Sequence, residues 1–301
     1  MTSSNFDGVI VVNKPAGWTS HDVVAKMRGI AGTRSVGHLG TLDPLATGVL
    51  PVMTGQATRL ARYFEKSEKA YEAMIRFGFA TTTYDREGEP LAPPVDVTIT
   101  AEQIEACLAP IRGEIDQMPP PISAKKIGGV PAYKLARKNQ PAELSPVRVS
   151  IYELTLLSAE GARARLRVRC SAGTYIRAIA HDLGNKLGCG AHVEELVRTA
   201  SGEFRLAQSH TLDELQSLKN EGRLAEVLLP MADLLPQFPR AGIDDLTARQ
   251  IRQGRDFSVS PFRANPDAEH VKAIDPSGNL VAIGQIALPH IYHPVVVFQA
   301  Q

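Results

Sequence analysis

The residue to which chemistry is most readily assigned is a carboxylate in a glycine-rich loop. Residues 37–48 read Gly-His-Leu-Gly-Thr-Leu-Asp-Pro-Leu-Ala-Thr-Gly and place Asp43 directly before Pro44. Proline disfavours the α conformation for the preceding residue, so the backbone of Asp43 should be extended. Glycines along the loop permit positive φ angles and the close approach of another chain. The loop can therefore present a carboxylate rigidly to a molecule that packs against its backbone.

The same loop also fits two other interpretations. Aspartate at the N-cap followed by proline is a common helix start, and the loop alone favours this structural role for Asp43. A metal site would need ligands besides His38 and Asp43, but no His-Glu-x-x-His motif or cysteine pair accompanies them. The dipeptide His181-Asp182 lacks further His/Asp spacing and reads as a surface pair on a helix. We therefore expect no metal.

The elements that would position this carboxylate are visible in the hydrophobic periodicity. Apolar and polar residues alternate from Tyr71 to Phe79, which predicts a half-buried strand. Residues 163–170 alternate arginine with apolar side chains and predict a second strand. Apolar residues at helical spacing over 174–187, followed by Gly188, predict a helix. Weaker patterns predict helices that are capped at Ser20 and at Thr100, a helix over 56–66 and a strand within 146–157.

The order of these elements is mixed, which favours the α+β fold class over a doubly wound α/β fold. A proline-rich stretch at 235–239 indicates a linker. Beyond it, two β-rich runs flank Asp275-Pro276-Ser277-Gly278, which is a hairpin signal. We predict one large domain over residues 1–235 and a small β-rich domain over residues 236–301.

Composition limits the class of protein. The chain has 301 residues, 44% of them hydrophobic and 22% charged, which is typical of a soluble globular protein. No run approaches the roughly 18 apolar residues that span a bilayer, and the first residues lack a basic n-region, so we expect neither a membrane partner nor a signal peptide. Three cysteines without metal-ligand spacing read as reduced thiols, so we expect a cytoplasmic protein.

The distribution of charge is more informative than its sum. The net charge is only +1, but residues 122–180 carry 11 Lys and Arg against 3 Glu, a local +8. Residues 71–121 carry 3 Arg against 9 Asp and Glu, a local −6. A polyanion should be attracted to the first segment through counterion release. The alternative is a solvated basic strand face with no partner.

Taken together, these stretches resemble the bacterial tRNA pseudouridine synthase B family (TruB), which modifies uridine 55 in the T loop of tRNA. The 37–48 loop resembles the signature of that family, and the similarity covers about residues 8–210. An ordered set of motifs is far more specific than Leu-Asp-Pro alone. The other matching stretches are Lys14-Pro15, Lys69-Ala70-Tyr71, Pro119-Pro120 with Ser123-Ala124, Gly173-Thr174-Tyr175-Ile176-Arg177, Asp182-Leu183-Gly184 and Arg198 with Ser201-Gly202.

The resemblance implies a catalytic centre. It makes Asp43 the catalytic carboxylate, Arg177 its ion-pair partner, and Tyr71 both the stacking residue for the target base and a candidate proton acceptor. Without the resemblance, Tyr71 fits a core tyrosine and Arg177 a surface arginine. The reaction breaks the N1–C1′ bond, rotates the uracil and rejoins it through C5. A carboxylate can attack C1′ or C6, or stabilise positive charge at C1′, and the sequence leaves these routes open.

The resemblance also implies a fold and partners. We expect a pseudouridine synthase fold with a mixed, mostly antiparallel sheet flanked by helices, followed by a PUA-like RNA-binding domain. The expected partner is tRNA, bound through its T arm and through its acceptor end by the C-terminal domain. We expect no cofactor and a monomer. The predicted substrate-binding residues are His38, which fills the space of the extruded base, Tyr71, Tyr175 and Leu196 at the pocket, and Lys14, Lys126 and Arg137 on the RNA track.

Two alternatives to a stand-alone isomerase remain. An RNA-binding folding helper (an RNA chaperone) would have the same fold and depend little on catalysis. The other alternative is the guide-RNA-dependent archaeal or eukaryotic relative. The Pro-Pro/Ser-Ala/Lys segment after Pro119 and a C-terminal tail of roughly 60 residues favour the stand-alone bacterial type.

Overall fold

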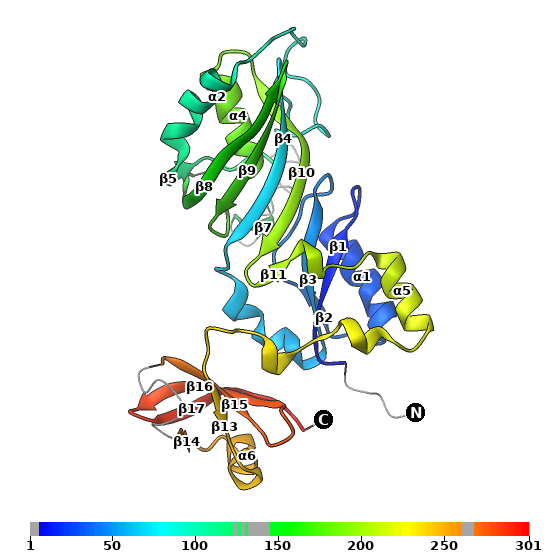
Figure 1. Cartoon of the computed structure of the whole chain (residues 1–301), viewed down its shortest axis with the longest axis vertical. Coiled ribbons are helices and arrows are strands. Elements are labelled where there is room, and N and C mark those ends of the chain that lie inside the picture. The colour runs from blue at the N-terminus through cyan, green and yellow to red at the C-terminus, as the bar shows by residue number, and fades with distance from the viewer. Residues whose placement is uncertain (1–5, 123–125, 128–129, 132–144, 260–267, 301) are drawn as a thin grey trace.

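The computed structural model of the chain describes residues 6–122, 126–127, 130–131, 145–259 and 268–300. Within these ranges the strands form a large mixed sheet, a five-stranded sheet in the C-terminal part and a two-stranded ladder of β6 (Lys126–Ile127) with β7 (Val130–Pro131). Helices flank the large sheet (Figure 1). The predicted α+β class and the β-rich C-terminal domain are confirmed.

The large sheet is mostly antiparallel, as expected. Among its described strands, only β3 and β10 pair in parallel. Two short strands lie off the main path, β2 (Val36–His38) beside β3 and β11 (Phe204–Arg205) beside β10. From one edge to the other, the order is β12 (Leu229–Pro230), β1 (Gly8–Lys14), β3 (Thr47–Thr54), β10 (Ala191–Ser201), β4 (Lys69–Phe77), β9 (Arg163–Cys170), β8 (Val147–Glu160) and β5 (Gly113–Gln117).

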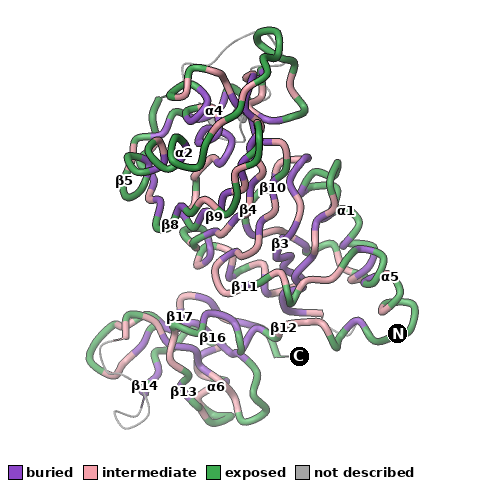
Figure 2. Tube along the Cα trace, turned by 45° about the horizontal axis from the view of Figure 1, so that its top comes forward, coloured by how far each residue is buried: buried purple, intermediate pink, exposed green. Residues whose placement is uncertain are grey.

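Both faces of the β1 end of this sheet are covered. Ile10 and Val12 belong to a core that includes the apolar faces of α1 and α5. Val9 and Val11 point the other way, into a second core with η1 and the C-terminal domain. All four residues are buried. Figure 2 shows a buried stretch along the neighbouring strand β3 as well. A strand that is buried on both faces reads as a continuous apolar run, which is why this segment shows no alternation.

The helices agree with the sequence in position, with two corrections in detail. The helix predicted to be capped at Ser20 is capped by Thr19, in a capping box with Asp22. The reason is that the Ser20 hydroxyl is engaged by the backbone of Leu42. The helix predicted over 56–66 is a 3₁₀ helix, η1. The α-helices are α1 (Ser20–Ala31), α2 (Ala101–Leu108), α4 (Ile176–Lys186), α5 (Leu212–Asn220) and α6 (Asp245–Arg252), and the 3₁₀ helices are η1 (Gly55–Phe64), η2 (Ala109–Ile111), η3 (Leu206–Gln208), η4 (Leu224–Val227) and η5 (Met231–Asp233).

The C-terminal sheet shares a core with the large domain. Leu280 and Phe298 pack in one buried cluster with Leu60 and Phe64 of η1. The large sheet ends at Pro230 and the small one begins after it, while the division at 235/236 stays a prediction. The small sheet runs in the order β13 (Arg240–Gly242), β15 (His270–Ile274), β16 (Leu280–Leu288), β17 (Ile291–Val297) and β14 (Phe257–Ser258). None of the described helices is long and apolar enough to cross a membrane.

A buried lysine fixes the connection between the two sheets. Lys272 of β15 is 2% exposed, and its Nζ donates to the carbonyls of Ala232 (3.0 Å) and Leu234 (2.6 Å). From the other side, the carboxylate of Glu203 accepts the N–H of Leu235. The segment between the two sheets is thus held by Lys272 of the small sheet and by Glu203, which follows β10 of the large sheet.

Replacing Lys272 by methionine should therefore lower the free energy of unfolding by about 1–3 kcal/mol. Methionine keeps most of the volume, but two buried carbonyls lose a charged donor. Chemical denaturation of the variant measures the loss, with the exposed Lys186→Met as the matched control. Equal stability of the two variants would show that the Lys272 contacts contribute nothing.

Candidate active site

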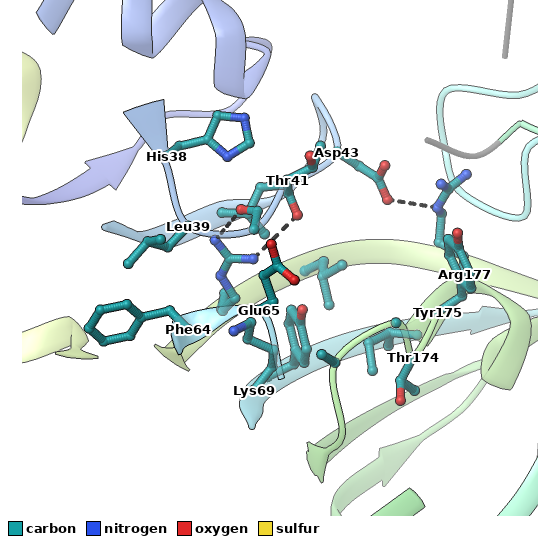
Figure 3. A pocket seen from close by; sticks show the side chains of 18 of the residues that line it. His38, Leu39, Thr41, Asp43, Phe64, Glu65, Lys69, Thr174, Tyr175 and Arg177 are labelled. Carbon is teal, nitrogen blue, oxygen red and sulfur yellow. Dashed lines mark hydrogen bonds and ion pairs between the residues drawn. The ribbon is translucent and has the colours of Figure 1, made fainter. Parts of the chain in front are cut away.

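A cavity of about 440 Å³ lies where the loop before β3, the end of η1, β4, the turn before α4 and β10 meet (Figure 3). These segments are far apart in the sequence, and the sheet brings them together because β10 runs between β3 and β4. The structure therefore places the predicted catalytic residues and pocket walls around one space. The predicted residues that line it are His38, Asp43, Tyr71, Tyr175, Arg177 and Leu196.

Backbone hydrogen bonds on both sides of Asp43 hold its loop in place. The N–H of Leu42 donates to Ser20 Oγ (2.9 Å), and that hydroxyl donates to the Leu42 carbonyl (3.2 Å). The carbonyl of Pro44 accepts the N–H of Gly17 (2.9 Å). The neighbours of Asp43 are thus fixed to the start of α1 and to the turn before it, which leaves the carboxylate free to face the cavity.

The interpretation of Asp43 as a helix cap is wrong. The Asp43 carbonyl accepts the N–H of Ala46 (3.1 Å) in a turn, and the chain then enters β3. The carboxylate is therefore held by its flanking residues and not by cap geometry. Gly40 and Gly48 have φ angles of +90° and +98°, as the glycine-rich pattern predicted, whereas Gly37 lies in β2.

Arg177 joins two carboxylates. Its Nε lies 2.9 Å from Asp43 Oδ2, and its Nη1 lies 3.3 Å from Asp85 Oδ2. The side chains of Arg177 and Asp85 are 5% and 4% exposed, while that of Asp43 is 36% exposed. The guanidinium also donates to the carbonyls of Thr83 (2.8 Å) and Ile122 (3.1 Å). The predicted ion pair is present (Figure 3), and its cation is buried, held by two carbonyls and a second carboxylate, and lines the cavity.

Asp85 also belongs to the site, although it was not predicted from the sequence. It lies in a turn after β4, where Tyr84 has a φ of +64° and stacks on His181 of α4, with ring centroids 3.7 Å apart. The Asp85 carboxylate accepts the N–H of Glu87 (3.0 Å), which fixes it toward Arg177. A lone aspartate in a polar turn carries no signal of its own, because its partner lies on a helix far along the chain.

Tyr71 and Tyr175 form part of the cavity wall by different means. Tyr71 lies on the buried face of β4 and is 8% exposed, and its burial raises the pKa of the phenol, so it is uncharged at neutral pH. Tyr175 ends the extended segment before α4, and Gln117 binds both its N–H (2.8 Å) and its carbonyl (3.0 Å). Gln117 thereby fixes the start of the helix that carries Arg177.

Two family models match this chain. Residues 28–176 match the model described as TruB family pseudouridylate synthase (N terminal domain), and residues 177–236 match tRNA pseudouridylate synthase B C-terminal domain. The chain belongs to the TruB family. It is therefore an enzyme, a pseudouridine synthase. The two matches meet at Ile176 and Arg177, so the Asp43–Arg177 ion pair joins the two halves that the family models separate.

Similar proteins agree with this assignment. The chain is 58% identical to the tRNA pseudouridine synthase B of Solibacter usitatus (strain Ellin6076), over 97% of this chain and 99% of that protein. It is 41% identical to the protein of the same name from Dehalococcoides mccartyi (strain CBDB1), over 98% and 97%. Among solved structures, a Cbf5-Nop10-Gar1 complex matches with a TM-score of 0.70 at 27% identity, over 99% of this chain and 85% of that chain. An H/ACA RNP bound to a substrate RNA matches with a TM-score of 0.72 at 25% identity, over 98% and 86%. This TruB-family chain therefore has the pseudouridine synthase fold.

His38 occupies the opposite wall of the cavity from β4. It ends β2, and its ring contacts that of His21 edge-on, with centroids 5.7 Å apart. Its buried Nδ1 has no hydrogen-bond partner among the described residues. Burial, with smaller contributions from His21 and Arg198, lowers the pKa of His38 to about 4. The ring is therefore uncharged at neutral pH and suited to contact with an uncharged base.

This histidine should make folding stability depend on pH. In the unfolded chain His38 binds a proton below about pH 6.5, whereas in the fold it does so only below about pH 4. Between these values the unfolded state binds more protons, so stability falls as the pH falls. His38→Gln should flatten that part of the curve, measured by urea denaturation at several pH values. An unchanged slope in His38→Gln would show that His38 does not cause the pH dependence.

The prediction that Lys14 lies on the RNA track is wrong. Lys14 is 0% exposed, and its Nζ donates to the carbonyls of Pro15 (2.8 Å), Trp18 (2.6 Å) and Pro44 (3.2 Å). Burial lowers its pKa to about 8, and the nearby Asp43 opposes that effect. Lys14 supports the residue after Asp43 from inside the protein, so it cannot reach a phosphate group.

The basic segment is also less basic than its composition suggests. Arg163 pairs with Glu194 (2.6 Å), Arg167 with Glu72 (2.9 Å) and Arg169 with Glu68 (2.8 Å), and all three arginines are exposed. Three of the four arginines on this face of β9 are thus paired with carboxylates of neighbouring segments. Of the other predicted RNA contacts, Arg137 lies outside the described residues, and for Lys126 the structure describes only the backbone, in β6.

The metal interpretation receives no support from the described part of the chain. No group of three or more His, Cys, Asp or Glu side chains gathers there at metal-binding spacing. Asp182 is exposed, as predicted, whereas its neighbour His181 is half-buried against Tyr84.

Proposed function

We propose that this enzyme isomerises uridine 55 in the T loop of tRNA to pseudouridine, with Asp43 as the carboxylate that acts on the target nucleotide. The observation that carries the proposal is the Asp43–Arg177 ion pair at 2.9 Å in the wall of a cavity that also contains Tyr71. The tRNA substrate is supported by the family model of residues 177–236 and by the names of the similar curated proteins.

Each of the three residues has a different role in the proposed reaction. The Asp43 carboxylate attacks C1′ or C6 of the uridine, or stabilises positive charge at C1′ while the N1–C1′ bond breaks. Arg177 pairs with that carboxylate and orients it toward the cavity. Tyr71 stacks on the uracil, and its protonated phenol is a candidate acceptor for the proton that leaves C5 only if it passes its own proton on in the same step. The detached uracil then rotates within the cavity and forms the C5–C1′ bond.

The substrate must enter this site as an extruded nucleotide. A uridine inside a folded loop cannot present C1′ to a carboxylate, and extrusion costs a few kcal/mol, which stacking must offset. His38, Tyr175 and Leu196 line the cavity beside Tyr71 and provide that contact. The C-terminal domain binds the acceptor end of the same tRNA.

The test uses tRNA transcripts labelled with tritium at uridine C5. Replacement of the C5–H by the new bond to C1′ releases the label. We expect the enzyme to release one equivalent, and a transcript that carries cytidine at position 55 to release none. Release from the cytidine-55 transcript, at the same rate as from the parent, would place the reaction at another uridine. Binding of both transcripts without release from either would favour the RNA-chaperone alternative.

A further inference from the structure

Arg198 is a buried cation that none of the steps above uses. It is 1% exposed, lines the cavity, and lies on β10 opposite Tyr71 of β4. Its guanidinium donates to three backbone carbonyls, which are neutral oxygens. A buried charge without a carboxylate partner is costly, so such an arrangement is expected where the charge has a task.

The contacts of Arg198 enclose the catalytic loop. Nη2 donates to the carbonyl of Gly40 (2.9 Å), Nη1 donates to that of Thr41 (3.3 Å), and Nε donates to that of Val49 (2.7 Å). Two of these carbonyls precede Asp43 and one follows it. One planar guanidinium thus connects the two ends of the loop at fixed separation, which a flexible lysine could not do equally well.

The backbone geometry that permits this contact is specific. Arg198 pairs in parallel with Gly48 of β3, and a Cβ at Gly48 would lie 2.3 Å from the Arg198 carbonyl. Glycine at position 48, with a φ of +98°, therefore lets β10 approach β3 closely. That approach places the Arg198 side chain beneath the loop that precedes β3.

Arg198 and Tyr71 are paired in the register of β10 and β4, so their side chains lie on the same face of the sheet, and both line the cavity. The charge of Arg198 acts against burial on the pKa of the Tyr71 phenol. Arg198 therefore binds the loop of Asp43 and lies beside Tyr71 in the sheet at the same time. The other groups that hold the loop, Ser20, Gly17 and Lys14, approach from the α1 side. The link to Tyr71 distinguishes Arg198 from these three.

We propose that Arg198 is a positioning residue that sets the separation of the Asp43 carboxylate and the Tyr71 hydroxyl across the bound uridine. The proposal rests on the proposed function, in which these two groups act on opposite parts of one nucleotide. Misplacing a reacting group by about 1 Å costs on the order of 100-fold in rate. Arg198 should therefore affect the chemical step far more than RNA binding.

The test compares three variants: Arg198→Met, Arg198→Lys and Arg112→Met. Arg112 also binds a carbonyl through two nitrogens, that of Leu154 at 3.0 and 2.9 Å, but lies outside the lining of the cavity. We expect Arg198→Met to slow single-turnover tritium release by roughly 100-fold, with Kd for tRNA within about threefold of wild type. Arg198→Lys should recover part of the rate, and Arg112→Met should keep it.

A second measurement follows the NMR signal of Tyr71 in the absence of RNA. In protein labelled with ¹³C at tyrosine Cζ, the Tyr71 resonance is assigned by its absence in Tyr71→Phe. Because Arg198 favours the phenolate and burial opposes it, Arg198→Met should move this resonance and shift its titration to higher pH. Arg112→Met should leave both unchanged. If Arg198→Met does not fold, Arg198→Lys decides the matter, with a smaller change in the same direction.

Two results would overturn the proposal. One is a single-turnover rate for the folded Arg198 variants within about threefold of wild type. The other is a Tyr71 resonance that stays in place when Arg198 is changed. If wild-type enzyme modified no uridine at position 55, the proposed function would fail, and the Tyr71 resonance would still report whether Arg198 positions that phenol.

Discussion

Asp43→Asn should abolish pseudouridine formation and leave tRNA binding nearly unchanged. The asparagine side chain has the same shape, and the backbone of Leu42 and Pro44 stays bound to Ser20 and Gly17. It cannot supply a negative charge or a nucleophilic oxygen, so the reacting C1′ or C6 loses its partner. Loss of a catalytic carboxylate costs roughly 10⁴-fold or more in turnover.

Tritium release under single-turnover conditions measures the rate, and filter binding of the same transcripts measures Kd. Asp116→Asn is the matched control, because Asp116 is an exposed aspartate that pairs with Arg148 at 3.2 Å. We expect full activity from the control and a Kd within about threefold for both variants. Release of label by Asp43→Asn at more than about a hundredth of the wild-type rate would remove Asp43 from its catalytic role.

Local patterns in the sequence were sufficient to predict the strand and the helix that carry Tyr71 and Arg177. Alternation predicted the strand of Tyr71, because one face of β4 packs on the core and the other faces partly outward. Helical spacing predicted α4, although its first turn begins at Ile176, after an extended Tyr175 bound by Gln117. Both patterns depend only on residues that are neighbours in the sequence, so they can be read without knowledge of the fold.

Contacts between distant segments could not be predicted in this way. Lys14 was predicted to contact RNA, but three carbonyls from two turns surround its ammonium. Asp85 and Arg198 meet the site only because β4, β10 and α4 are assembled around it. The pairing of Asp43 with Arg177 was predicted from the family resemblance alone. The residues that hold these two in place, such as Asp85 and Arg198, show no local sequence pattern that would predict these contacts.

The Asp43 loop illustrates the same limit. Asp-Pro after a glycine predicts a helix start on local grounds, yet the chain turns at Pro44 and enters a strand. The pairing of β3 with β1 over seven residues outweighs the local preference of one Asp-Pro step. Tertiary structure overrides propensity most easily where the preference is worth about 1 kcal/mol or less.

Arg177→Met should cost both stability and activity, for separable reasons. It leaves Asp85, whose side chain is 4% exposed, without its cation, and breaking a buried ion pair on one side costs about 3–5 kcal/mol. It also removes the group 2.9 Å from the Asp43 carboxylate. We expect a fall in the free energy of unfolding of that size and no measurable tritium release.

The double variant Arg177→Met, Asp85→Asn separates the two effects. Removing the stranded charge of Asp85 should restore about half or more of the lost stability, whereas Asp43 still lacks its partner, so activity should remain absent. Arg163→Met is the control, because it breaks an exposed pair with Glu194 and should change stability by less than about 1 kcal/mol. Recovery of activity in the double variant would mean that Arg177 serves the site only by balancing Asp85. Loss of activity despite restored stability would assign the cation to Asp43 itself, since the fold would then be intact around an unpaired carboxylate.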